Sequence, residues 1–269
     1  MIAVPQTTLP EPRQVTVTRY VTPLREGGSL PAIVEGDDLG TYVLKFRGAG
    51  QGPRVLIAEL VAGEIAHALG LPVPELVFAD LDPVLGRSEP DQEIQELINA
   101  SAGLNLGMDY LPGSFAYDPV SAPAIDPFLA SCVVWFDALI TNVDRTVRNT
   151  NMLLWHRSLY LIDNGAAFYA QYSGPNYPSR AKSRFPQIKD HVLLGRAGQL
   201  AAADETLAPR LTPEMIHHIV GLVPESWMND GAFDGPAQQR VALEEYVLRR
   251  LESPRSFVEE AVNARAQFV

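Results

Sequence analysis

The sequence predicts an α+β protein in which a small β-rich N-terminal lobe precedes a mainly helical C-terminal lobe. Between residues 15 and 47, β-branched and aromatic residues form short runs separated by glycine-containing or polar turns, as in a meander of strands. In the second half, apolar residues instead recur with helical spacing over longer segments. The chain has 269 residues, 46% of them hydrophobic, which is enough to build two packed lobes.

Composition excludes several classes of function. The formal net charge of −11 gives a surface that repels phosphate backbones, so no direct nucleic-acid binding is expected. No apolar run reaches the length of a membrane span and no signal peptide begins the chain, so we expect a cytoplasmic protein without a membrane partner. Cys132 is the only cysteine, which excludes an intrachain disulfide and fits a reducing compartment. Its apolar neighbours predict a buried thiol.

The first lobe is expected to begin with three strands, at residues 15–21, 31–34 and 41–46. The turn after the first strand contains Gly27, Gly28 and Ser29. Because glycine lets backbone amides approach anionic oxygens, this turn could lie over the phosphates of a nucleotide. An ordinary glycine turn is the alternative.

Lys45 lies in the third strand, in the run Tyr-Val-Leu-Lys-Phe. A helix predicted over residues 56–69, which stops at Gly70, carries Glu59 near its start and Glu64 further along. A strand lysine followed by a helix glutamate is the ion-pair arrangement of protein kinases, with Glu59 as the first candidate and Glu64 as the second. The alternative is a solvated edge-strand lysine with two solvated helix acids.

The next segments lead to a predicted lobe boundary. Residues 71–82 are extended and rich in proline, and residues 83–103 are polar, with a short helix. A strand then ends on four residues, Met108, Asp109, Tyr110 and Leu111. An extended backbone at such a position can offer its N–H and C=O groups to an adenine edge, which places the N-lobe at residues 1–112 and the C-lobe at residues 113–269. A strand that simply ends at Pro-Gly is the alternative.

Residues 137–165 carry the side chains best suited to chemistry: Asp144, Asn149, Asn151 and Asp163. Two short apolar runs follow the amides, so these side chains lie at the ends of short strands. Phosphoryl transfer with metal ions needs one carboxylate that orients the attacking hydroxyl and accepts its proton, and an Asn with a second Asp that hold Mg²⁺. The residues of this segment can fill those roles.

Two details of the segment leave alternatives open. The catalytic loop of protein kinases places Asn five residues after Asp, which favours Asn149, whereas Asn151 directly precedes the apolar strand. Asp163-Asn164-Gly165 stands where kinases have Asp-Phe-Gly, and Gly165 is expected to permit a backbone turn that a side chain would resist. The alternative is a hairpin whose Asp and Asn residues only cap turns.

The C-terminal lobe is predicted to contain helices at residues 126–141, 213–222, 238–251 and 254–268. Trp135, in the first of these helices, is expected in the core. Residues 170–188 show no periodicity and follow the predicted metal-binding segment. Arg180, Lys182 and Arg184 in this stretch could dock a phosphate or an acidic substrate, or could form a solvated basic loop.

In their order along the chain, these motifs resemble the HipA-like kinase family, in particular its stand-alone branch. The matching segments are Gly-Gly-Ser-Leu-Pro, Tyr-Val-Leu-Lys-Phe, Gly-Met-Asp-Tyr-Leu, Asn-Val-Asp-Arg-Thr-Val-Arg-Asn-Thr-Asn and Leu-Ile-Asp-Asn-Gly. The resemblance implies a two-lobed protein-kinase-like fold that uses ATP with Mg²⁺ or Mn²⁺ and phosphorylates a protein Ser or Thr. By motif match, Lys45 would hold the α- and β-phosphates and Asp144 would act as the catalytic base. Asp163 with Asn149 or Asn151 would bind the metal.

The chain also departs from full-length HipA toxins, which carry an N-terminal subdomain that helps contact a DNA-binding antitoxin. Only about 25 residues precede Gly27, which leaves an antitoxin partner doubtful and an unidentified protein substrate as the expected partner besides ATP. Two other functions fit the same motifs: a nucleotide-binding pseudokinase or scaffold, and a kinase of a small molecule or lipid. Candidates for all four catalytic side chains favour an active kinase, because a scaffold needs none of them.

Overall fold

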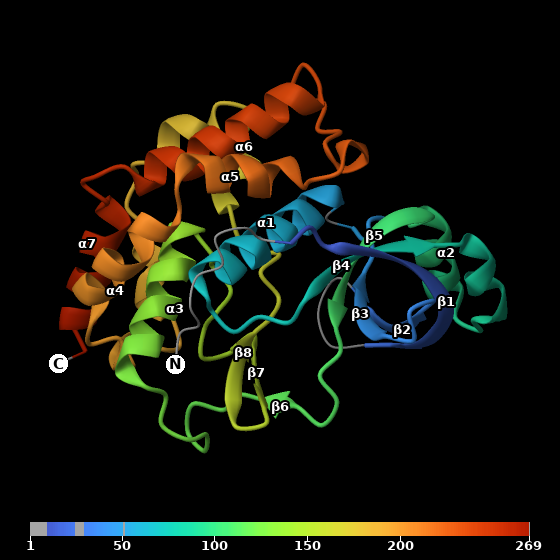
Figure 1. Ribbon diagram of the computed structural model, residues 1–269, viewed down its shortest axis with the longest axis horizontal. Coiled ribbons are helices and arrows are strands. Elements are labelled where there is room, and N and C mark those ends of the chain that lie inside the picture. The colour runs from blue at the N-terminus through green and yellow to red at the C-terminus, as the bar shows by residue number, and fades with distance from the viewer. Residues whose placement is uncertain (1–9, 25–29, 51, 269) are drawn as a thin grey trace.

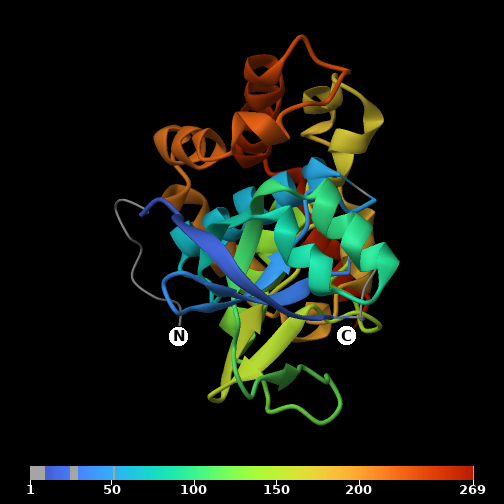
Figure 2. The ribbon, with the colours of Figure 1, turned by 90° about the vertical axis from the view of Figure 1, so that its right-hand side faces the viewer.

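The computed structural model describes residues 10–24, 30–50 and 52–268 and confirms an α+β protein of two lobes. A barrel of strands forms one end of the molecule, and helices with a small sheet form the other (Figures 1 and 2). The turn that contains Gly27, Gly28 and Ser29 lies outside the described residues.

The barrel consists of β1 (Arg13–Pro23), β2 (Ala32–Gly36), β3 (Thr41–Lys45), β4 (Leu76–Leu81) and β5 (Gly103–Asp109). The strands pair in the order β1-β2-β3-β5-β4, and parallel pairing of β1 with β4 closes the barrel. The expected meander is confirmed in the first three strands. The closure joins Arg13 to Val77, segments so distant in the sequence that no local pattern predicts their pairing.

Apolar side chains fill the barrel. Leu44 of β3 is fully buried in a cluster with side chains of the other strands, as the alternation of a strand requires. A 3-10 helix (Pro83–Ser88) and α2 (Gln92–Ala100) form where one short helix was expected. Ile94 and Ile98 of α2 pack into the same cluster, so α2 covers the barrel.

Helix α1 (Pro53–Leu69) lies between the barrel and the helices of the second lobe (Figure 1). It begins with proline, which suits the first helical position, and ends at Gly70, whose φ of 71° is left-handed. The predicted helix stop is therefore confirmed. Its residues 56–66 are all buried, because both lobes pack against it.

The second lobe is built from α3 (Pro127–Leu139), α4 (Leu200–Leu207), α5 (Pro213–Gly221), α6 (Pro236–Leu251) and α7 (Ser256–Ala266). A small sheet of β6 (Phe115–Ala116), β7 (Met152–Trp155) and β8 (Ser158–Leu161) lies below them in Figure 1. Trp135 and Cys132 of α3 are buried, as predicted, and burial raises the pKa of the Cys132 thiol to about 12. The sequence does not predict α4, because its run Leu-Ala-Ala-Ala-Asp-Glu-Thr-Leu has few large apolar side chains to mark a face.

The stretch without periodicity and the residues just after it fold into short 3-10 turns at Tyr169–Ser173, Tyr177–Arg180, Pro186–Asp190 and Leu194–Arg196. The last three of these turns pack against α3, α6 and α7, and the first packs against the second, so helices of the second lobe fix the positions of the last three. Among the helices of the described ranges, none combines the length and the apolar character that crossing a bilayer requires.

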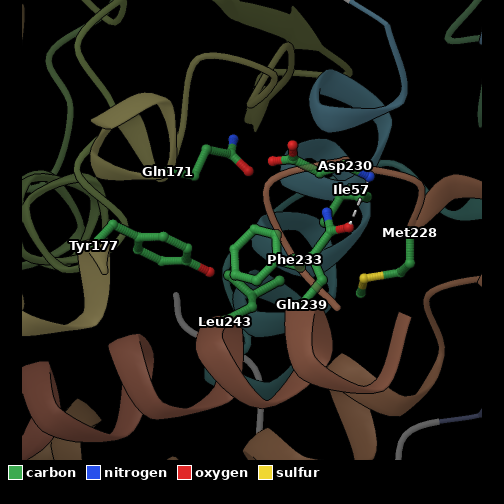
Figure 3. A pocket seen from close by; sticks show the side chains of 8 residues that line it. All are labelled: Ile57, Gln171, Tyr177, Met228, Asp230, Phe233, Gln239 and Leu243. Carbon is green, nitrogen blue, oxygen red and sulfur yellow. Dashed lines mark hydrogen bonds between the residues drawn. The ribbon is translucent and has the colours of Figure 1, made fainter. Parts of the chain in front are cut away.

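One stretch of the second lobe reaches across to the first. Trp227, 1% exposed, donates its indole N–H to the carbonyl of Leu104 at 3.1 Å, and its ring packs edge-on against Phe78 with 5.9 Å between centroids. Arg54 of α1 pairs with Asp230 at 2.5 Å. Figure 3 shows the small cavity beside Asp230, where side chains from α1 and from the second lobe meet. The two lobes are therefore tied together by side chains on this side.

Candidate active site

Lys45 lies at the end of β3 and is 8% exposed. Because β3 pairs with both β2 and β5, Lys45 is not on a sheet edge, and the alternative of a solvated edge lysine is wrong. Its Nζ lies 2.7 Å from Oε2 of Glu59 and 2.6 Å from Oδ1 of Asp163. A strand, a helix and the segment after the β7–β8 hairpin thus meet at one ammonium group.

The two candidate helix acids have different partners. Glu59 is 1% exposed and contacts Lys45. Glu64 lies further along α1, where its Oε1 is 3.3 Å from Nδ1 of His67. The structure therefore brings Glu59, and not Glu64, to the strand lysine.

In this cluster, the neighbouring opposite charges affect the pKa values of Lys45 and Asp163 more than burial does. Burial alone would lower the pKa of Lys45, but the Glu59 and Asp163 carboxylates raise that pKa to about 12. Burial alone would raise the pKa of Asp163, but Lys45 holds it below its usual range. The ammonium group and the Asp163 carboxylate are therefore both kept charged.

Asp144 lies in the loop after α3 and is held by both amides that the sequence leaves as alternatives. Its Oδ2 accepts hydrogen bonds from Nδ2 of Asn149 at 2.7 Å and from Nδ2 of Asn151 at 3.2 Å. Asn149 is exposed. Asn151 is buried, and its Nδ2 also lies 3.5 Å from the backbone oxygen of Asp163. Asn151 therefore sits between the two acids.

The turn at Asp163 is made by the acid and not by the glycine that follows. Asp163 has a left-handed φ of 54°, whereas Gly165 lies in the turn that follows it and has no left-handed φ. The expectation that a side chain at Gly165 would be resisted is confirmed, but the reason is not the backbone angle. The glycine is needed for space: a Cβ there would lie 2.6 Å from Cγ1 of Val55 and 3.5 Å from Oε2 of Glu59. Its missing side chain lets the segment approach α1 closely.

Three buried residues to which the sequence analysis gives no role hold the loop of Asp144. Asp137 and Arg145 are 0% and 1% exposed, and Nε of Arg145 lies 2.6 Å from Oδ2 of Asp137. Nε2 of His191 lies 2.9 Å from the same oxygen. Burial alone would raise the pKa of Asp137, but Arg145 and the hydrogen bond with His191 lower it below its usual range. One sequence feature could have pointed to this cluster: Asp137 is a charged residue inside the apolar run Phe-Asp-Ala-Leu-Ile.

The guanidinium of Arg145 also ties this loop to the hairpin. Its Nη2 donates to Oδ1 of Asn164 at 2.6 Å, and its Nη1 donates to the carbonyls of Ile162, at 3.2 Å, and Asn151. Arg145 follows Asp144 directly in the sequence. One buried side chain therefore fixes the loop of Asp144 relative to the segment that carries the second acid.

The four residues predicted to face an adenine, Met108, Asp109, Tyr110 and Leu111, lie at the end of β5 and just beyond it. The N–H of Asp109 donates to the carbonyl of Glu75 at 2.9 Å, and that of Tyr110 to the carbonyl of Thr41 at 3.0 Å. Met108 packs in the core, and Leu111 is 7% exposed. The barrel thus already uses two of the amides at this strand end.

A comparison with known protein families finds a match to most of the chain. Residues 17–259, most of the chain, match the family model described as HipA-like kinase. The chain belongs to the HipA-like kinase family. The resemblance of its motifs is thereby confirmed, and the family supports a phosphotransferase.

A solved structure shares the fold of this HipA-like kinase. The chain is similar to the crystal structure of the Helicobacter pylori proinflammatory kinase CtkA, with 13% identity and a TM-score of 0.55 over 96% of this chain and 99% of that chain. A structure of the Golgi casein kinase with Mn/ADP bound gives 12% identity and a TM-score of 0.44 over 95% of this chain and 74% of that chain. The likeness to CtkA shows the fold alone and confirms a protein-kinase-like architecture. No curated protein sequence matches significantly.

Proposed function

We propose that this HipA-like kinase transfers the γ-phosphoryl group of ATP to the hydroxyl of a protein Ser or Thr. The observation that carries the proposal is the double contact of Lys45 with Glu59 and Asp163, at 2.7 Å and 2.6 Å. A protein kinase acts only when its lysine–glutamate pair and its metal-binding aspartate are both in place. Here both are assembled, and Asn151 connects them to Asp144.

Asp144 is proposed to orient the acceptor hydroxyl and to take up its proton. Its Oδ2 is held by two amides, while its Oδ1 has no hydrogen-bond partner among the residues that the structure describes. A carboxylate fixed through one oxygen can accept a proton at the other. The two amides therefore hold Oδ2 of Asp144 in place and leave Oδ1 to accept the proton.

Asp163 and Asn151 are proposed to hold Mg²⁺ or Mn²⁺, because carboxylate and amide oxygens are ligands that hard cations prefer. The Asp163 side chain remains 49% exposed although its Oδ1 contacts Lys45, so it can reach a ligand. A metal ion bound there would bridge the phosphates and offset their charge. Because Asn151 lies between the two acids, we assign the metal-binding role to Asn151. The five-residue spacing from Asp144, as in protein kinases, favours Asn149 instead.

The nucleotide is proposed to lie between Lys45 and the end of β5. An ammonium group has three N–H donors, and two of those of Lys45 point to Glu59 and Asp163, which leaves one for the α- or β-phosphate. Since the amides of Asp109 and Tyr110 are used by the barrel, the adenine edge would use other backbone groups between Met108 and Leu111. The lobe boundary stays near residue 112 in this proposal.

Incubation of the protein with γ-labelled ATP and a lysate of its source organism tests the proposal. Wild type should label itself or a lysate protein, whereas Asp144→Ala should not, because Asp144 acts in transfer more than in nucleotide binding. The variant should still bind Mg·ATP within about tenfold, or about 1.4 kcal/mol. Equal labelling by the variant would remove Asp144 from the mechanism. Nucleotide binding without any labelling would favour a scaffold, and a labelled small molecule alone would favour a small-molecule or lipid kinase.

A further inference from the structure

A pocket of about 300 Å³ lies beside the segment that follows the metal-binding acid. Nine residues between Tyr169 and Gln187 line it, together with Thr141 after α3 and Tyr246 and Arg250 of α6. The volume is within the range of protein sites that bind small chemical groups. Neither Lys45 nor Asp144 lines it, so it is separate from the cluster described above.

The wall of this pocket contains a buried cation without an acidic partner. Arg250 is 2% exposed and donates to the carbonyls of Ala138, at 2.6 Å, Leu139, at 2.6 Å, and Ala181, at 2.9 Å. Within the described ranges, no carboxylate lies at ion-pair distance from Arg250. Burial lowers the pKa of Arg250, as expected for a desolvated charge that no anion offsets. An anion in the pocket would supply the missing charge.

Two more arginines of the lining are available to a ligand. Arg180 is exposed, and no hydrogen-bond or ion-pair partner for it lies in the part of the chain that the structure describes. Arg184 is 63% exposed and reaches Glu260 only at 3.8 Å, which is a weak surface pair. Lys182, between them, is already paired with Glu252 at 3.2 Å. In a chain of net charge −11, the pocket is thus a local basic site.

The pocket is within reach of Asp144. Thr141 forms part of its wall and precedes Asp144 by three residues, so their Cα atoms are at most about 11 Å apart. An extended peptide advances about 3.3 Å per residue. A side chain about three or four residues from a hydroxyl bound at Asp144 can therefore enter the pocket. Tyr169 and Tyr172, 56% and 45% exposed, offer ring surface to the peptide.

We propose that this pocket binds an acidic side chain of the protein acceptor, carboxylate or phosphoryl, about three or four residues from the phosphorylated hydroxyl. This inference rests on the proposed transfer to a protein. Arg180 and Arg184 contact the anion from the rim, and Arg250 offsets its charge from the wall. The planar fork of a guanidinium fits both kinds of oxyanion. The kinase thereby selects acidic substrates.

Peptide kinetics test the selectivity. Each peptide of a series carries one Ser and places Glu, Gln or phosphoserine at successive positions on either side of it. The pocket variant is Arg180→Gln/Arg184→Gln, and the matched control is Arg19→Gln/Arg157→Gln, which removes the same charge from exposed residues outside the pocket. For wild type and control, the best Glu peptide should have a KM at least about tenfold below that of its Gln counterpart. The pocket variant should lose this preference with kcat nearly unchanged.

Binding without nucleotide separates this inference from the proposed function. The Glu and Gln peptides, fluorescently labelled, are titrated by anisotropy at about 0.15 M salt, where long-range charge effects are screened. The pocket variant should bind the Glu peptide at least about tenfold more weakly than wild type and control do. Selective binding by wild type without phosphorylation of any peptide would overturn the transfer to protein but support the pocket. Tighter binding of phosphoserine would also support the pocket and assign it to phosphoryl groups. Equal binding of Glu and Gln peptides, or unchanged binding by the pocket variant, would overturn it.

Discussion

At the scale of single residues, the two amides beside Asp144 are distinguishable by substitution. Asn151→Ala should lower turnover by about 100-fold or more, since it removes a proposed metal ligand, whereas Asn149→Ala should change turnover by less than about fivefold. Steady-state kinetics at saturating Mg·ATP measure both effects. The reverse pattern would return the metal-binding role to Asn149.

A glycine variant controls for backbone strain at the same position. Asn151 has a left-handed φ of 46°, so alanine there adds about 1 kcal/mol of strain, which glycine does not. If the lost amide explains the inactivity, Asn151→Gly should be as inactive as Asn151→Ala. A glycine variant with nearly normal turnover would show that strain, rather than a lost ligand, is responsible.

The raised pKa of Lys45 is expected to make the stability of the fold depend on pH in the alkaline range. Its pKa rises from 10.5 to about 12 on folding, which corresponds to about 2 kcal/mol of stability. This contribution is fully present below pH 10.5 and is lost as the pH rises through about 12. We expect the difference in unfolding free energy between wild type and Lys45→Met, measured by urea titration, to be constant from about pH 8 to 10 and to shrink above that. A constant difference up to pH 12 would contradict the charged cluster.

At the scale of elements, the contact of Gly165 with Val55 sets the distance between α1 and the segment after β8. Gly165→Ala should push these elements apart, because its Cβ would lie 2.6 Å from Cγ1 of Val55. We expect a loss of about 1–3 kcal/mol in stability and a fall of at least about tenfold in kcat, since α1 carries Glu59. Urea unfolding and kinase assays measure the two effects.

A second substitution tests the steric explanation. Val55→Ala removes the atom that the new Cβ would meet, so Gly165→Ala/Val55→Ala should recover most of the lost activity. A double variant as impaired as Gly165→Ala alone would mean that the glycine serves another purpose.

At the scale of the whole molecule, Trp227 joins the two lobes. Trp227→Ala should cost about 3–5 kcal/mol, because it removes a ring that packs on Phe78 and a hydrogen bond to Leu104. Trp227→Phe, which keeps a ring but loses the N–H donor, should cost only about 1 kcal/mol. Chemical denaturation followed by circular dichroism measures both. Equal costs for the two variants would mean that the ring contact contributes little.

Sequence and structure agree where a short stretch of chain determines the outcome. The stop at Gly70 and the alternation around Lys45 are local, and the order of the motifs around Asp144 and Asp163 is enough to predict the kinase family. The barrel closure and α4 depend on distant partners. For example, Asp204 of α4 accepts hydrogen bonds from Trp135, at 2.8 Å, and from Arg255, at 2.7 Å and 2.8 Å.

Within the site, spacing marks the residues that we propose to face a ligand, but it does not mark those that support them. Asp137 and His191 are separated by more than fifty positions, and their pairing depends on burial that no motif records. The choice between Asn149 and Asn151 is likewise spatial, since both follow Asp144 at short intervals. The order of residues in the sequence indicates candidate reacting groups, and the packing of the fold determines which of these groups are in contact.

Closure of the barrel removes the strand edges through which β-sheets usually recruit a strand from another protein. β1 is bonded on both sides, antiparallel to β2 and parallel to β4. A protein that docks on the N-terminal lobe therefore has to recognise side chains and cannot simply extend the sheet. Loss of β1 would expose two edges at once, on β2 and on β4, and would turn a self-contained lobe into a template for aggregation.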